Sequence, residues 1–126
     1  MSLEELKKQF VVDEDATRSR LEGLVREIMK HCVVDKRGVV HITNQKLTVK
    51  DKLRVALCAR WIGAQLESSI SPTISIDELA LATGISRDQV RARCSELIKE
   101  KFATAPQQGI FQVIAYKAQP FLLALS

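Results

Sequence analysis

Three arginines occur within seven residues of the chain, at Arg87, Arg91 and Arg93. Arginine carries a permanent charge, and its planar set of donors fits both guanine edges and phosphate oxygens. Closely spaced arginines on one helix therefore indicate nucleic-acid binding. The alternative is an ordinary solvated helix face, because Asp88 and acidic residues further along dilute the positive charge.

The sequence contains no catalytic or metal-binding motif. It has no glycine-rich phosphate loop, no nucleophile elbow and no metalloprotease histidine pair. His31 and His41 have no carboxylate at ligand spacing, and the widely spaced Cys32, Cys58 and Cys94 are interpreted as small buried side chains. We therefore expect no enzyme activity, no metal, no cofactor and no small-molecule ligand.

The composition of the 126 residues is that of a globular domain, with 46% hydrophobic and 27% charged residues. Aromatic residues make up only 5%, which predicts an aliphatic core. The net charge of +4 is spread thinly along the chain and permits a nucleic-acid partner without requiring one. No apolar run approaches the roughly 18–20 residues of a membrane span, and the acidic N-terminus differs from a signal peptide. A cytoplasmic protein with reduced thiols is expected.

The first 47 residues predict helices and one hairpin. A short helix is expected over residues 2–9 and a second from Thr17 onward. The second helix carries an apolar stripe of Leu21, Leu24, Val25, Ile28 and Met29. Two β-branched runs within residues 32–42 flank a turn that ends in Gly38, where a positive φ is expected.

Residues 49–66 predict a long helix that begins at the cap residue Thr48. Because this helix is apolar around most of its circumference, we expect it at the centre of the fold. Lys50 and Lys52 stand at its start, where the backbone N–H groups of a helix also attract phosphate. They are candidate contacts to a nucleic-acid backbone, and a solvated helix face is the alternative.

A short helix over residues 76–83 is predicted by Ser75 and Glu78, which have the spacing of a capping box. Gly84 follows, at a place where a left-handed residue ends a helix. A loop is expected before this helix, over residues 68–73.

A second helix is predicted over residues 87–101, with Ser86 as its cap. Its inward stripe consists of Val90, Cys94, Leu97 and Ile98. The polar side chains off that stripe, near the N-terminal half, are Arg87, Gln89, Arg91 and Arg93. This pattern is typical of a helix-turn-helix, in which the second helix enters the major groove by its N-terminal residues.

Residues 102–116 predict a β-hairpin whose turn contains Gln107 and Gln108. The turn has no cation, so these glutamines act only through hydrogen bonds, and an ordinary surface turn is the alternative. The tail after residue 116 is apolar and must be covered, either by its own core or by a second copy.

Residues 48–116 resemble the winged helix-turn-helix domain of many prokaryotic and archaeal DNA-binding regulators. The residues that carry the resemblance are Glu78, Leu79, Ala80, Gly84, Ile85, Ser86, Val90, Arg93, Leu97, Phe102 and Ala103, followed by the hairpin. It implies a mainly α fold with a small β component. Residues 1–47 would form a helix and hairpin extension, residues 48–116 the winged domain with recognition helix 87–101, and residues 117–126 an apolar tail.

Two positions depart from the family pattern. Cys94 stands where leucine is usual, which is a conservative packing change. Lys101 stands where glycine often ends the recognition helix, and this predicts a helix that runs directly into the following strand.

The resemblance implies a DNA-binding protein, either a transcriptional regulator or a nucleoid-associated protein, with double-stranded DNA as its partner. The implied DNA contacts are Ser86, Arg87, Gln89, Arg91, Arg93, Lys50, Lys52, Gln107 and Gln108. A homodimer built from one or both terminal segments is expected, with residues 1–47 as a candidate dimerisation element, because paired recognition helices match paired half-sites. The alternative is a winged-helix interaction module within a larger assembly, which the low net charge, the uncharged turn and the apolar tail favour. The scarcity of aromatics argues against binding to single-stranded RNA.

Overall fold

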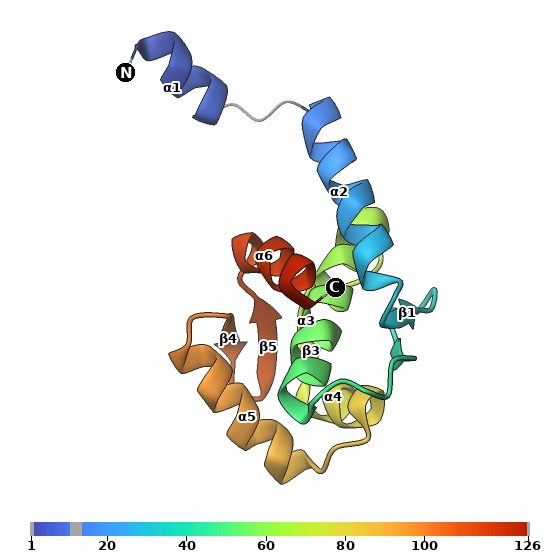
Figure 1. Ribbon diagram of the computed structural model, residues 1–126. Coiled ribbons are helices and arrows are strands. Elements are labelled where there is room, and N and C mark those ends of the chain that lie inside the picture. Colours follow the sequence, from blue (N-terminus) through green and yellow to red (C-terminus); the bar gives the residue numbers. More distant parts are fainter. Residues whose placement is uncertain (1, 11–13, 126) are drawn as a thin grey trace.

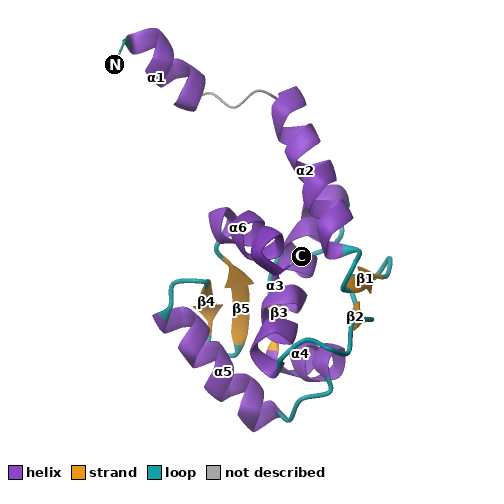
Figure 2. Ribbon diagram, in the orientation of Figure 1, coloured by secondary structure: helices purple, strands orange, loops and turns teal. Residues whose placement is uncertain are grey.

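The computed structural model describes residues 2–10 and 14–125, and these residues form a mainly helical molecule with two small antiparallel sheets (Figures 1 and 2). The helices are α1 (Leu3–Phe10), α2 (Glu14–Ile28), α3 (Val49–Leu66), α4 (Ile76–Thr83), α5 (Arg87–Lys99) and α6 (Ala115–Leu125). The strands are β1 (Cys32–Val34), β2 (Val40–Ile42), β3 (Ile74–Ser75), β4 (Ala103–Gln107) and β5 (Ile110–Val113). The expectation of a mainly α fold with a small β component is confirmed.

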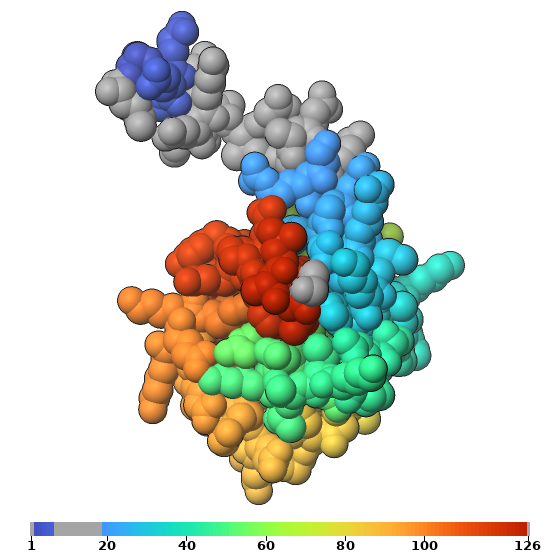
Figure 3. Space-filling model, in the orientation of Figure 1, coloured from blue at the N-terminus to red at the C-terminus, as the bar shows by residue number. Residues whose placement is uncertain are grey.

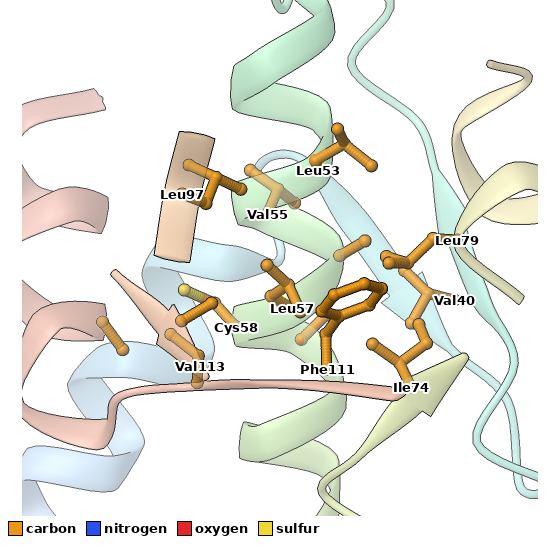
Figure 4. Packing of buried hydrophobic residues seen from close by; sticks show 14 of the residues in the cluster. Val40, Leu53, Val55, Leu57, Cys58, Ile74, Leu79, Leu97, Phe111 and Val113 are labelled. Atoms are coloured by element: carbon orange, nitrogen blue, oxygen red, sulfur yellow. The ribbon is translucent and has the colours of Figure 1, made fainter. Parts of the chain in front are cut away.

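Helix α3 lies at the centre of the fold, as its apolar pattern predicted. Its cap forms as expected, with the Asp51 N–H donating to Thr48 Oγ1 at 3.1 Å. Leu53 and Leu57 are almost completely buried, and Figure 4 shows Leu57 beside Phe111 among the labelled core residues. Apart from two phenylalanines, the buried core is aliphatic or consists of small side chains. One central helix therefore holds the surrounding elements together by apolar burial.

The larger sheet has the strand order β3–β5–β4, with both pairs antiparallel. Strand β3 is only two residues long and follows the expected loop of residues 68–73; its second residue, Ser75, is also the expected cap of α4, and the prediction missed the strand. Ile74 pairs with Phe111, a partner far along the chain, and two residues are too few to show an alternating pattern. The predicted hairpin forms from β4 and β5, and Gly109 in its turn has a φ of +76°.

The prediction that the helix after Ser86 runs directly into the strand is wrong. Helix α5 ends at Lys99, and Lys101 adopts a φ of +62°. The Phe102 N–H donates to the Leu97 carbonyl at 2.9 Å, and the Lys101 N–H donates to the Ile98 carbonyl at 3.0 Å. These two bonds form a Schellman motif, so Lys101 takes the left-handed conformation that glycine usually provides. Lysine in place of the usual glycine therefore adds backbone strain at position 101 but does not change where the helix ends.

The C-terminal segment is helical and was predicted wrongly as a hairpin strand to residue 116 followed by a tail. Strand β5 ends at Val113, and α6 begins at Ala115. Ala118 and Leu122 are fully buried, so α6 covers the core of its own chain. Figure 3 shows this helix lying on the body of the molecule. Pro120 inside the helix removes one backbone donor and obscured the helical signal.

The N-terminal elements follow the prediction with small differences. Helix α1 is confirmed, and α2 begins at Glu14, earlier than expected. Met29 is 63% exposed and so departs from the predicted apolar stripe. The β1–β2 hairpin is confirmed, and Gly38 has the expected positive φ, at +88°. Figure 1 shows α1 apart from the other helices and strands.

The buried cation Arg60 joins the small hairpin to the body. It lies on α3, donates to the Ser71 carbonyl at 2.7 Å and to the Gly38 carbonyl at 3.1 Å, and pairs with Glu78 on α4. One side chain thus holds a turn, a loop and two helices in place.

Candidate nucleic-acid interface

Four residues with cap and turn spacing, Ser75, Glu78, Gly84 and Ser86, set the ends of α4 and the start of α5. Ser75 and Glu78 form the complete capping box of α4. Gly84 has a φ of +71° and ends that helix, and its N–H donates to the Ala80 carbonyl at 2.9 Å. Ser86 then caps α5, because its Oγ accepts the Gln89 N–H at 3.3 Å. Two helices therefore meet through a short turn whose geometry comes from local sequence.

Helix α5 buries one stripe and exposes its N-terminal half. Val90, Cys94 and Leu97 are buried as predicted. Ile98 is 37% exposed, so its predicted place in the buried stripe is wrong. It lies on the flank of the stripe, where packing against the core is incomplete. Figure 2 shows α5 along the lower edge of the molecule, beside β4 and β5.

A groove of about 610 Å³ lies between α5 and the β4–β5 turn. Its lining includes Arg87 and Arg91 of α5 together with Gln108 of the turn. The structure therefore brings together three of the predicted site residues, from segments about twenty positions apart. The buried ring of Phe111 also lines this groove.

The two groove arginines differ in their electrostatic partners. Arg87 Nε lies 2.9 Å from Asp77 Oδ1, in a pair where both side chains are well exposed. Arg91 makes no ion pair with any residue that the structure describes. An exposed pair of this kind is screened by water and opens readily, so both guanidinium groups are accessible to an anion.

Arg93 lies away from this groove, in a network of alternating charges between α5 and α3. Its guanidinium lies 3.1 Å from Glu96, and Glu96 lies 3.3 Å from Lys50. Glu100 accepts from both Lys50 and Arg54, and Arg54 also pairs with Asp51. The network contains three cations and three carboxylates and is therefore neutral.

This network changes the ionisation of its members. The hydrogen bond from Lys50 lowers the pKa of Glu100, and the same bond raises the pKa of Lys50. Both groups therefore stay charged and paired near neutral pH. Lys50 is thus already paired with Glu96 of α5 and with its C-cap residue Glu100, while Lys52 Nζ donates to Gln45 Oε1 at 3.4 Å.

The remaining predicted site residues lie on the surface. Ser86, Gln89, Gln107 and Gln108 are exposed. Gln107 is the last residue of β4 and pairs with Ile110 across the hairpin. Of the predicted set, the exposed end of α5 and the hairpin turn lie together, and Lys50 with Arg93 forms a separate charged cluster.

Sequence reasoning noted that Glu96 and Glu100 dilute the positive charge of α5, but it missed which cations they pair with, and it missed Asp77 as the partner of Arg87. Asp77 belongs to α4, Glu96 belongs to the far half of α5, and Glu100 is the C-cap residue of α5. An acidic residue one turn from a basic one signals a pair along a helix, as for Arg93 and Glu96. No such spacing connects Lys50 to Glu100 or Asp77 to Arg87, because those pairs form between different helices.

The cysteines are buried, and the acidic groups of the described residues form no cluster of three or more with histidine or cysteine. Burial raises the pKa of Cys32 and of Cys94 to about 12, and it also raises that of Cys58. Among the residues described, no three histidine, cysteine or acidic side chains gather as a metal site would require. None of the described helices combines the length and apolar character needed to cross a membrane.

Comparison of the chain with protein-family models, curated proteins and solved structures returns no match. Its function is therefore inferred from its own residues and their arrangement.

Proposed function

We propose that this protein binds double-stranded DNA through α5 and the β4–β5 turn, as a winged helix-turn-helix. The observation that carries the proposal is the exposed cationic N-terminal half of α5 beside a hairpin turn, with Arg87, Arg91 and Gln108 around one groove. The order of α3, α4, α5 and hairpin is the order in which winged domains place their first helix, second helix, recognition helix and wing. A role in transcription or nucleoid organisation, a cytoplasmic location and the absence of catalysis belong to the same proposal.

The physical basis is the fit between an exposed helix and the DNA major groove. That groove, about 12 Å wide, admits one helix with its side chains. Arg87 and Arg91 lie on the side of α5 that faces the turn, where they can meet phosphate oxygens as the helix enters. The turn would lie against the adjacent backbone and contribute hydrogen bonds from Gln107 and Gln108.

The direct test is a fluorescence anisotropy titration of the full chain on mixed-sequence duplex DNA at low salt. We expect binding in the micromolar range or tighter, weakening as salt rises, because phosphate contacts release counterions. The R87A/R91A double variant should lose most of this affinity.

A matched control is R26A/R37A, which removes two exposed arginines from α2 and the β1–β2 turn. This variant should bind like the wild type. Absence of wild-type binding at tens of micromolar, or equal losses in both double variants, would refute the proposal.

A homodimer is part of the proposal, and the exposed apolar side chains beside the N-terminal hairpin support it. Met29, Val33 and Leu66 are all more than half exposed and line one apolar cavity of about 240 Å³ between α2, α3 and β1. A second copy would cover this surface. Light scattering over a concentration series should give twice the chain mass, and L66E should shift it toward the monomer; a monomeric wild type would refute the dimer.

The neutral charge network favours a second candidate function, a winged-helix module that binds protein instead of DNA. Lys50, Arg54 and Arg93 are neutralised within the chain, so much of the basic charge near α5 is already satisfied. This candidate predicts no DNA binding by the wild type. It also predicts that a protein partner shields the α5 amides from hydrogen exchange.

A further inference from the structure

The outermost face of α5 differs in chemistry from its arginine-bearing flank. Ala92 lies two positions beyond the buried Val90, which is about 200° around the helix axis. Asp88 lies one turn before Ala92 on the same face, and both residues are exposed. We call these two residues the crest of α5, because they stand opposite the buried stripe in the N-terminal half of the helix; Lys99 lies on the same face at the far end.

Arg87 and Arg91 lie on the flank of the helix that faces the β4–β5 turn. Both line the groove shared with Gln108, and Arg87 is drawn toward Asp77 of α4. If α5 enters the major groove with its crest toward the bases, its arginines point to one side. There they face the phosphates of the DNA strand that borders the groove.

We propose that the two sets of side chains divide the work: Asp88 and Ala92 read base edges, while Arg87 and Arg91 hold the phosphate backbone. This inference rests on the proposed function of α5 as a DNA-binding helix. It reverses the expectation from sequence that the arginines are the main candidates for base contacts.

The chemistry of the crest specifies the bases that it selects. An ionised carboxylate only accepts hydrogen bonds, so Asp88 pairs with the amino groups of cytosine or adenine and repels the acceptor-only edge of guanine. The methyl group of Ala92 packs against the methyl group of thymine. Asp88 forms no ion pair within the described part of the chain, so its carboxylate is available for this contact.

Asp88 also acts against indiscriminate binding. Its negative charge stands on the face that approaches the polyanion, so any duplex without an amino group opposite it is bound less well. A purely structural role is the competing explanation, since an acidic residue in the first turn of a helix is stabilised by the helix dipole.

The test is selection of bound duplexes from a randomised library, followed by affinity measurements across salt concentrations. The variants of the full chain are D88N, R91A and the control D77N, which removes the same charge beside the flank. We expect D88N to bind duplexes without an amino group opposite residue 88 more tightly and to lose about fivefold or more of its preference for cytosine at that position, while adenine is still accepted because asparagine also pairs with it. D77N should also bind more tightly but keep the wild-type preference.

R91A should weaken binding to every duplex and lower the slope of log affinity against log salt by about one, with its base preference unchanged. A loss of base preference in R91A but not in D88N would overturn the inference, as would a wild type that binds DNA without any preference. A D88N variant that only unfolds at lower temperature would show the structural role instead. Failure of the wild type to bind DNA at all would refute the proposed function itself.

Discussion

Replacement of Arg60 by methionine should strongly destabilise the fold, because Arg60 is the one buried arginine, lysine or carboxylate among the residues whose burial the structure describes. Methionine keeps much of the volume of the side chain and removes its donors. The Ser71 and Gly38 carbonyls, now 2.7 and 3.1 Å from the guanidinium, lose their partner, and Glu78 loses its counter-ion. The change thus separates the polar contribution of Arg60 from its packing.

The magnitude follows from the burial of these groups. Hydrogen bonds from a charged donor contribute roughly 1.5–3 kcal/mol each. The two carbonyls account for most of the loss, because Glu78 is 42% exposed and regains water. The two lost carbonyl bonds together therefore cost about 3–5 kcal/mol, and we expect R60M to fall in this range. That is a large share of the 5–15 kcal/mol typical of a domain.

Urea unfolding followed by circular dichroism measures this loss. The midpoint should fall by on the order of 2 M urea with an unchanged slope. The matched control is R37M, whose side chain is 87% exposed and 4.0 Å from its acidic partner, and which should stay within about 0.5 kcal/mol of the wild type. If R60M lost less than about 1 kcal/mol, the two carbonyls would have to be hydrated, and the role assigned to Arg60 would be wrong.

Three further predictions follow from the same contacts. K101G should raise the free energy of unfolding by about 0.5–1 kcal/mol in thermal melts, because glycine relieves the left-handed strain at this position; a loss would contradict the Schellman geometry. The hydrogen bond from Lys50 holds the pKa of Glu100 below its ordinary 4.5. The stability that the ionised Glu100 adds is therefore complete above pH 4.5 and is lost as the pH falls through the lowered pKa of the folded protein. E100Q should flatten this part of a profile of unfolding free energy against pH. The three buried cysteines should resist a thiol reagent near pH 8 in the folded protein and react fully in denaturant, and rapid labelling of the native protein would contradict their burial.

Local features of the fold were predictable from the sequence. The caps at Thr48, Ser75 and Ser86 lie where their spacing placed them, and Gly38 and Gly84 adopt the expected positive φ. Each of these features depends on hydrogen bonds or steric limits within a few residues. The burial of α3 was likewise predictable, because a helix that is apolar on most sides requires neighbours on most sides.

Other features depended on partners far along the chain. Strand β3 exists because Ile74 pairs with Phe111, and two residues carry no pattern of their own. Helix α6 has apolar residues at Ala118, Phe121 and Leu122, a spacing that predicts a helix, but Pro120 obscured it. In both cases burial against the core outweighed the local signal.

In the candidate site, too, some features follow from the local sequence and others from tertiary packing. The sequence by itself determined which side chains of α5 carry charge and which are apolar, and it placed the helix start at Ser86. Only the tertiary structure decided which cations remain accessible: it paired Lys50 with Glu96 and Glu100 across two helices and left Arg91 beside the hairpin turn. The physical reason is that a charge is neutralised by whatever lies within a few ångströms, and that distance is set by how the helices pack.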